Sequence, residues 1–355
     1  ERIQFLKELI DGFEKDNPLK RYKGEVYYDV PNFIQLFSAI KREGWKTVWL
    51  IEKIDEYTQA IIPETDGLYN KREKAKGNII LTQKGKDEVE RMQKLKAAIN
   101  SFEYYQQILK KNDRYDFDDM INWVIQLFEN NEDVLLRYQE QFQYILVDEY
   151  QDTSGSQNKI IELLISFWQN ENPNLFVVGD DDQSIYRFQG ANLQNMMHLA
   201  NRFKDDMLRV VLTQNYRSVP NILKVAQTLI ENNEQRLANQ HIDLTKKLTA
   251  ANVSLQSLNI SPVIRVYENE FAENVHITQS IKTLIQKDVS PSHIAIIYRE
   301  HKTGDELLKF LQQEKIPYYV KRSINLLDDL FIQHILQIIR YIVAELDTPA
   351  SGDVL

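Results

Sequence analysis

Two neighbouring carboxylates follow a short apolar run in the middle of the chain. Asp148 and Glu149 come directly after Tyr144–Val147. One carboxylate at such a position can hold Mg²⁺, directly or through water, while the other polarises an attacking water. Phosphate hydrolysis needs both functions side by side, because Mg²⁺ must neutralise the phosphates while a base aligns the nucleophile. A helix N-cap with a solvated neighbour is an equal alternative for this pair.

A second polar cluster, Gly179–Ala191, also follows an apolar run. Its three consecutive aspartates, 180–182, repel one another, which favours a bound cation or a basic neighbour over a bare solvated loop. Gln183 is an uncharged donor that could sense a terminal phosphate. Tyr186 and Phe188 could stack on nucleobases, with core packing as an equal alternative for both rings.

A third cluster, Gln214–Ser218, leads into an expected helix that starts near Pro220. Tyr216 beside Arg217 suits the recognition of a purine ring and a phosphate oxygen. The alternative is a capping turn with an exposed arginine.

The elements that position these clusters are expected to form a buried parallel sheet. Apolar runs at 144–147, 175–178 and 209–212 lie roughly 30 residues apart with helical sequence between them, which is typical of parallel strands. In such sheets, ligands bind beyond the carboxyl ends of the strands. All three polar clusters lie at those ends, so the sequence predicts a site there.

The flanking thirds of the chain differ in character. The first third is expected to be helical, because apolar residues recur at helical spacing around 33–40 and 89–99. Its basic connector, 71–77, is either a solvated loop or a contact to a nucleic-acid backbone. Asp116 is expected to cap an amphipathic helix that runs to Phe128. The last third predicts a second α/β unit after a polar surface excursion at 239–261, with strands at 263–267, 294–298 and 317–320 and helices at 271–285 and 307–313.

Composition limits the classes of protein. The chain has 355 residues, with 43% hydrophobic and 27% charged residues, which is typical of globular proteins of two or three domains. There is no cysteine for a disulfide or a thiolate metal site, and the six histidines lack metal-ligand spacing. No apolar run approaches about 18 residues, so no membrane segment is expected. The first residue is Glu1 and no signal peptide follows, so we expect a cytoplasmic protein, seen as part of a longer chain.

The charge distribution does not favour binding of nucleic acid by the whole surface. The net charge is −9, and residues 114–213 hold 17 acidic against 7 basic residues. A local basic stripe could still bind nucleic acid while the remaining surface repels it.

Three strings together resemble a known family. Ile145–Thr153, Gly179–Ala191 and Gln214–Ser218 are similar to motifs II, III and IV of the UvrD/Rep/PcrA helicases of superfamily 1, in the family's order and at about its spacing. Asp116–Asp119 resembles the motif that precedes them. The likeness is strong over 114–222 and weak over 294–345. It implies an α/β fold with two RecA-like parallel-sheet motor domains, both incomplete. Residues 1–113 would be a helical insertion of the 1B type, 114–213 the second part of the first motor domain, and 214–355 the first part of the second.

The resemblance implies ATP and Mg²⁺ as cofactors and assigns roles around the triphosphate. Asp148 would coordinate Mg²⁺, and Glu149 would act as base toward the hydrolytic water. Gln183 would contact the γ-phosphate and couple its loss to movement. Tyr216 would stack on adenine, and Arg217 would reach the γ-phosphate from the second motor domain.

The DNA contacts implied by the resemblance are Tyr186 and Phe188, which would face single-stranded DNA. The family has Trp-Arg where this chain has Phe188-Gln189, so the contact should be weaker here. The implied function is an ATP-dependent 3′–5′ DNA helicase or translocase that acts on single-stranded DNA and on junctions with duplex. The alternatives are the motor part of a helicase–nuclease and a non-catalytic DNA-binding scaffold.

A phosphate-binding loop is missing from these 355 residues. The Gly-Lys pair at 85–86 is followed by Asp87, and no Gly-x-x-x-x-Gly-Lys-Ser/Thr occurs anywhere. The family's motifs V and VI are absent as well. We therefore expect no significant ATPase from this chain alone. We also expect an exposed sheet edge, filled by self-association that completes the sheet or by local rearrangement.

Overall fold

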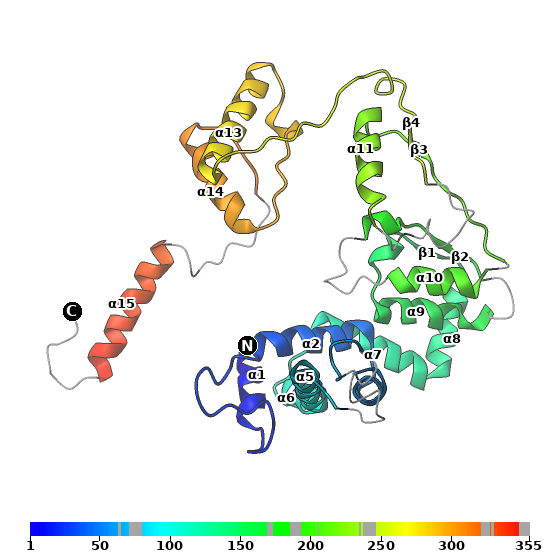
Figure 1. Cartoon of the computed structure of the whole chain (residues 1–355), viewed down its shortest axis with the longest axis vertical. Helices are drawn as coiled ribbons and strands as arrows, with labels where there is room; N and C mark the ends of the chain where they lie inside the picture. Colours follow the sequence, from blue (N-terminus) through cyan, green and yellow to red (C-terminus); the bar gives the residue numbers. More distant parts are fainter. Residues whose placement is uncertain are drawn as a thin grey trace. The chain divides into compact units, whose positions relative to one another are not determined.

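The computed structural model describes residues 1–62, 65–70, 80–168, 173–184, 193–204, 206–233, 236, 246–320, 327 and 330–347. Contacts divide the chain into two compact units, Glu1–Ser261 and Pro262–Leu355 (Figure 1). The predicted boundary at 213/214 lies inside the first unit, and the three-part division of the chain stays a prediction. Within the described residues, no helix has both the length and the apolar character needed to cross a membrane.

The N-terminal part of the first unit is a helical cluster around aromatic side chains. Phe37 is fully buried, and its ring centroid lies 5.3 Å from that of Phe33, 5.2 Å from Phe102 and 4.9 Å from Tyr105. The helical spacing of apolar residues thus correctly predicted helices here. The elements are α1 (Arg2–Asp11), α2 (Val30–Glu43), α3 (Thr47–Glu56), the π-helical turn η1 (Tyr57–Ile61), α5 (Gln83–Asn100) and α6 (Phe102–Lys111).

Helix α7 (Phe117–Asn130) begins at the predicted cap. The Asp116 carboxylate accepts a hydrogen bond from the Asp119 N–H at 3.0 Å, and the Asp119 carboxylate accepts one from the Asp116 N–H at 3.0 Å. This reciprocal capping box satisfies backbone donors that have no partner within the helix. Helix α8 (Glu132–Gln141) follows.

A buried lysine joins α2 to the start of α7. Lys41 Nζ lies 2.9 Å from the Asp116 carboxylate and 2.8 Å from that of Asp119, and the lysine side chain is almost fully buried. Gln106 donates a further hydrogen bond to Asp119 at 3.1 Å. Burial opposes the charged form of Asp116, but the hydrogen bond and charge of Lys41 outweigh it and hold the pKa of Asp116 below its ordinary value.

Replacing Lys41 by methionine should lower the free energy of unfolding by about 3–5 kcal/mol at pH 7, because the Asp119 carboxylate stays buried without its cation. Because the folded-state pKa of Asp116 lies below its ordinary value of 3.8, the stability that this ion pair contributes is complete above pH 3.8 and is lost as the pH falls through the lower pKa of the folded state. The difference between variant and wild type should therefore narrow below pH 3.8. Urea unfolding, followed by the circular dichroism signal of the helices at several pH values, measures this difference in the free energy of unfolding.

Lys53→Met is the matched control, because Lys53 pairs with Glu56 at 2.7 Å on an exposed helix face. It should change stability by less than about 0.5 kcal/mol. Equal effects of the two substitutions would contradict a structural role for the Lys41 pair.

The predicted parallel pairing of the first two apolar runs is confirmed. Strand β1 (Ile145–Val147) pairs in parallel with β2 (Leu175–Val177), with Ile145 opposite Leu175 and Val147 opposite Val177. Helix α9 (Gly155–Ile165) lies between them in sequence, as Figure 1 shows. The other elements of this unit are the 3₁₀ turns η3 (Tyr150–Asp152), η4 (Ser166–Trp168) and η5 (Asp181–Gln183), and the helices α10 (Leu193–Arg202) and α11 (Pro220–Ile230).

Two expectations about this sheet are wrong. Residues 209–212 form no strand, and the paired residues are Gln214–Asn215 (β3), which lie parallel to Thr249–Ala250 (β4) in a second two-stranded sheet. Within the expected surface excursion at 239–261, residues 249–250 form a strand, while 251–261 are irregular and mostly exposed as predicted. The first sheet is also not buried on both faces, because Leu146 is 74% exposed between two half-buried neighbours. An apolar run signals burial, whereas a strand requires a partner for its backbone groups.

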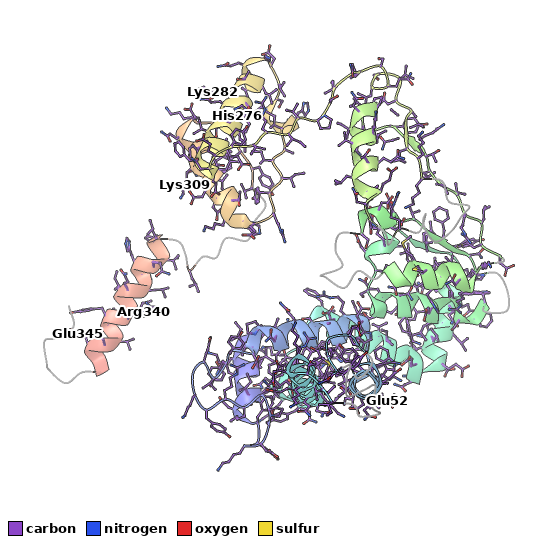
Figure 2. All side chains as sticks on the ribbon, in the orientation of Figure 1. Glu52, His276, Lys282, Lys309, Arg340 and Glu345 are labelled. Carbon is purple, nitrogen blue, oxygen red and sulfur yellow. The ribbon has the colours of Figure 1, made fainter. Side chains whose placement is uncertain are left out.

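The second unit is helical in its described residues. Helices α13 (Glu270–Gln286) and α14 (His301–Gln313) pack around Ile281, Leu307 and Leu311. The exposed side chains of Lys282 and Lys309 (Figure 2) form ion pairs with Glu314 at 2.6 Å and Glu306 at 2.7 Å. The remaining elements are the 3₁₀ turn η7 (Pro291–His293) and α15 (Leu330–Asp347).

The strands predicted for this unit are not observed. Residues 263–267, 294–298 and 317–320 make no ladder, and the described part of Pro262–Leu355 contains no strand. Several of their apolar side chains remain open to solvent, with Ile264 93% and Ile297 95% exposed, whereas Ile294 packs against the core of this unit. The helices expected at 271–285 and 307–313 are confirmed, the second one beginning earlier, at His301.

Candidate functional site

Asp148 and Glu149 lie exposed at the carboxyl end of β1. The Glu149 N–H donates to the Asp148 carboxylate at 2.9 Å, and Glu149 has a left-handed backbone with φ of 49°. Such a conformation costs a non-glycine residue about 1–2 kcal/mol and turns the chain sharply out of the strand. The next N–H, of Tyr150, donates to the Val178 carbonyl at 2.9 Å, which fixes this turn to the end of β2.

The loop after β2 is joined to this turn by side-chain hydrogen bonds. The Gln151 amide donates to the Glu149 carboxylate at 2.6 Å and accepts from the Asp180 N–H at 3.0 Å. The Gln183 amide donates to the Asp180 carboxylate at 2.8 Å. The structure therefore brings two predicted site residues, Glu149 and Gln183, into one hydrogen-bonded chain.

The three aspartates of this loop have basic neighbours. Lys246 Nζ lies 2.9 Å from the Asp180 carboxylate and also contacts Asp181. Arg236 binds Asp182 through two nitrogens, at 2.8 and 2.7 Å. The sequence suggested either a bound cation or a basic neighbour for these aspartates, and the structure places basic side chains beside all three.

The charges of Asp180 and Lys246 stabilise each other. Burial opposes the charged forms of both Asp180 and Lys246, but their hydrogen bonds and opposite charges outweigh it. The pKa of Asp180 is therefore lowered and the pKa of Lys246 is raised. Both groups stay ionised at neutral pH, so the loop keeps its basic partners there.

The third cluster forms a capping turn with an exposed arginine, as in the alternative interpretation of its sequence. The Asn215 side chain accepts hydrogen bonds from the N–H groups of Arg217 at 3.0 Å and Ser218 at 2.8 Å, and α11 then begins at Pro220. The Tyr216 hydroxyl donates to Gln214 at 2.7 Å while its ring is 61% exposed.

Among the described residues, no contact joins Arg217 to Glu149 or Gln183. The segment that contains Arg217 is connected to the loop that contains Gln183 less directly. Lys246 binds the aspartate loop and lies three residues before β4, and β4 pairs with β3, which leads into Arg217. The cluster that contains Glu149 and Gln183 is thus linked to the arginine cluster through the ion pairs of Lys246 with the aspartate loop and through one short sheet.

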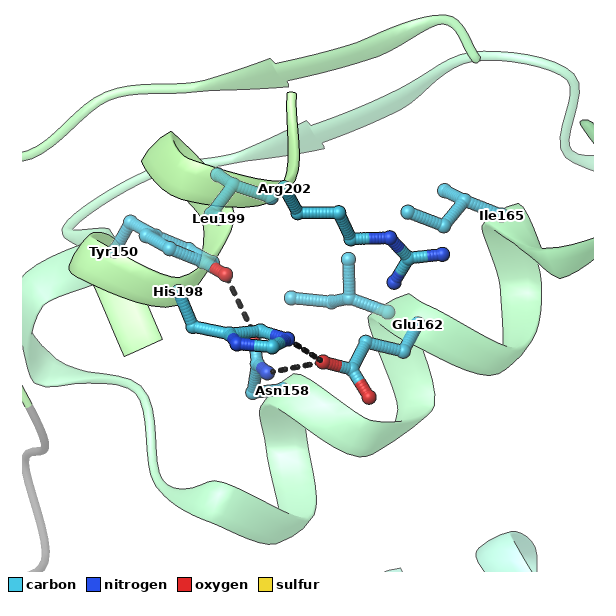
Figure 3. A pocket seen from close by; sticks show the side chains of 8 residues that line it. Tyr150, Asn158, Glu162, Ile165, His198, Leu199 and Arg202 are labelled. Atoms are coloured by element: carbon cyan, nitrogen blue, oxygen red, sulfur yellow. Dashed lines mark hydrogen bonds and ion pairs between the residues drawn. The ribbon is translucent and has the colours of Figure 1, made fainter. Parts of the chain in front are cut away.

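A polar network that the sequence did not indicate supports the turn after β1 (Figure 3). The buried Tyr150 hydroxyl donates to Asn158, Asn158 donates to Glu162 at 3.1 Å, and His198 lies 3.7 Å from Glu162. Burial, with a smaller effect of the Glu162 charge, raises the pKa of Tyr150 to about 12. The neutral phenol therefore anchors the residue after Glu149 to α9. The i, i+4 spacing of Asn158 and Glu162 was the available signal.

Three predicted features lie outside the described residues. These are Tyr186, Phe188 and the basic connector at 71–77.

Comparison with known proteins identifies the class and then the family. Residues 7–204 match the UvrD/REP helicase N-terminal domain, and residues 210–352 match the UvrD-like helicase C-terminal domain. The protein is thus an α/β protein of the helicase class. It belongs to the UvrD/REP helicase family, as the three motif strings predicted.

Relatives agree with this assignment. The chain is 34% identical over 230 residues to the putative ATP-dependent DNA helicase YjcD of Bacillus subtilis, covering 65% of this chain and 28% of that protein. It is 36% identical over 232 residues to the ATP-dependent DNA helicase PcrA of Leuconostoc citreum, covering 63% and 29%. It is 34% identical over 250 residues to the ATP-dependent DNA helicase Rep of Buchnera aphidicola, and this match covers 70% of this chain and 36% of that protein. The chain spans about a third of the length of these relatives.

Proposed function

We propose that this chain supplies the hydrolysis residues of an ATP-dependent 3′–5′ DNA helicase and single-stranded DNA translocase. The observation that carries the proposal is the hydrogen-bonded chain from Glu149 through Gln151 and Asp180 to Gln183, at the carboxyl edge of a parallel strand pair. That edge is where α/β proteins bind their ligands. The relatives named ATP-dependent DNA helicases support the substrate class.

The residues at this edge fit Mg-ATP. The described residues contain no cluster of three or more His, Asp or Glu side chains that would hold a metal on their own. Mg²⁺ in phosphoryl-transfer sites is usually held by one or two carboxylates together with the substrate phosphates, so the single exposed carboxylate of Asp148 suffices. Bound Mg²⁺ would neutralise the charge of the phosphates. Glu149 would accept a proton from the attacking water, and the Gln183 amide would donate to a γ-phosphate oxygen.

The third cluster, Gln214–Ser218, would complete the site after movement. We propose that Tyr216 stacks on adenine and that Arg217 reaches the γ-phosphate when two RecA-like motor domains close. The exposed positions of both side chains leave them available for such contacts. In this proposal residues 114–213 and 214–355 are parts of the two motor domains, and 1–113 form the helical insertion.

We propose single-stranded DNA and its junctions with duplex as partners, with Tyr186 and Phe188 as DNA contacts. We propose that the isolated chain self-associates by completing the first sheet, which has two described strands and exposes Leu146 (74%) and Phe176 (61%). Light scattering measures that association, and a monodisperse monomer at all concentrations would contradict it.

The experiment that tests the function is ATP turnover by the complete gene product, with and without single-stranded DNA, beside the isolated 355-residue chain. The isolated chain should be inactive, because its sequence holds no phosphate-binding loop. The complete product should hydrolyse ATP and respond to DNA. A complete product that binds DNA without turnover would instead favour a non-catalytic scaffold.

A further inference from the structure

Gln151 occupies a buried position between the two strand ends. Its side chain is 1% exposed, and both polar atoms of its carboxamide are engaged. The nitrogen donates to a Glu149 carboxylate oxygen at 2.6 Å, and the oxygen accepts from the Asp180 N–H at 3.0 Å. One neutral carboxamide thus connects Glu149, which would activate water at the end of β1, to the loop that follows β2.

The glycine before Asp180 makes this approach feasible. A Cβ atom at Gly179 would lie 2.7 Å from the Gln151 amide oxygen and 3.3 Å from the backbone nitrogens of Gln151 and Tyr150. A side chain at position 179 would therefore push the Gln151 amide oxygen away and crowd the backbone of the turn after β1. The missing side chain therefore lets the loop approach closely enough for the Asp180 N–H to reach Gln151.

Glu149 depends on this contact for its side-chain orientation. Its carboxylate is exposed and follows a left-handed backbone turn, and within the described residues Gln151 is the hydrogen-bond donor to it. On the other side, the Asp180 carboxylate accepts from the Gln183 amide at 2.8 Å. A displacement of the Gln183 loop would therefore move Asp180, then Gln151, and then the Glu149 carboxylate.

We propose that Gln151 is a positioning residue that holds the Glu149 carboxylate for water activation and couples it to the state of the Gln183 loop. This inference rests on the proposed ATPase function. A carboxamide is suited to the task because it donates to a carboxylate and accepts from an N–H at the same time. A glutamate at 151 would keep the acceptor but place a like charge against Glu149. A methionine of similar length would provide neither contact.

The test uses the complete gene product with Q151M and Q151E, and Q139M as the matched control. Gln139 is also buried and also uses its amide within the first unit, donating to the Leu163 carbonyl at 2.8 Å and to Ser166 at 3.0 Å, but it contacts no site residue. Q151M and Q151E should each lower kcat by about 10–100-fold, because a small misplacement of the base has effects of that order. The KM for ATP should change by less than about threefold, and Q139M should keep kcat within about threefold of wild type.

Amide exchange at Asp180 provides an independent measurement. Its N–H should lose protection in Q151M and keep it in Q151E, which still offers an acceptor oxygen. If Q151M fails to fold, Q151E decides the kinetic question. Wild-type kcat in Q151E, or an equal loss in Q139M, would overturn the positioning role. If the wild-type product hydrolyses no ATP, the proposed function fails, and equal Asp180 exchange in wild type and Q151M would then separately overturn the bridge.

Discussion

Glu149→Gln should lower DNA-stimulated ATP turnover of the complete gene product by about 10²–10⁴-fold, the range expected for loss of a general base. The amide keeps the size of the carboxylate but cannot accept a proton from water. ATP binding should stay within about threefold of wild type, because the contact is made mainly in the transition state. Steady-state turnover and binding of a fluorescent ATP analogue measure the two effects.

Glu140→Gln is the matched control, since Glu140 is an exposed glutamate on α8 of the same unit. It should leave turnover unchanged. Retention of more than about a tenth of wild-type turnover by Glu149→Gln would contradict its assignment as the base.

Arg217→Ala should reduce turnover by about 10³–10⁵-fold, the range found when an arginine that stabilises transition-state charge is removed. The side chain is exposed and its backbone N–H, not its guanidinium, makes the described contact with Asn215, so folding should be unaffected. Arg217→Lys should restore only part of the activity, because an ammonium lacks the planar fork of a guanidinium. Single-turnover kinetics with saturating ATP measure the chemical step.

Arg209→Ala provides the comparison for Arg217, as Arg209 is exposed in the segment just before β3. Its loss should not affect the chemical step. Equal, small effects of both alanine variants would show that Arg217 stays a surface residue throughout the cycle.

The parallel pairing of β1 and β2 could be predicted because both runs are short, apolar and separated by a helical segment. The same rule failed at 209–212, since hydrophobicity reports a tendency to be buried and not the presence of a hydrogen-bonding partner. The residues that do pair, Gln214–Asn215, are polar and match Thr249–Ala250 far along the chain. Neither segment carries a local strand signal.

The candidate site was predictable in its residue types but not in its connections. Asp148, Glu149 and Gln183 stand in motif strings that can be identified by eye. The bridge made by Gln151 reaches a backbone N–H 29 residues away, and Lys246 reaches Asp180 across 66 residues. Such contacts depend on how the chain folds back, which no local pattern encodes. The demand of three adjacent aspartates for a basic partner was foreseeable, whereas the identity of that partner was not.

A structure of the complete gene product with Mg²⁺, a non-hydrolysable ATP analogue and single-stranded DNA tests most directly whether separate segments serve one triphosphate. We expect the Gln183 amide and the Arg217 guanidinium at hydrogen-bonding distance from γ-phosphate oxygens, with the Glu149 carboxylate against the attacking water. An ATP-bound, DNA-bound structure with Arg217 on a surface away from the nucleotide would contradict this arrangement.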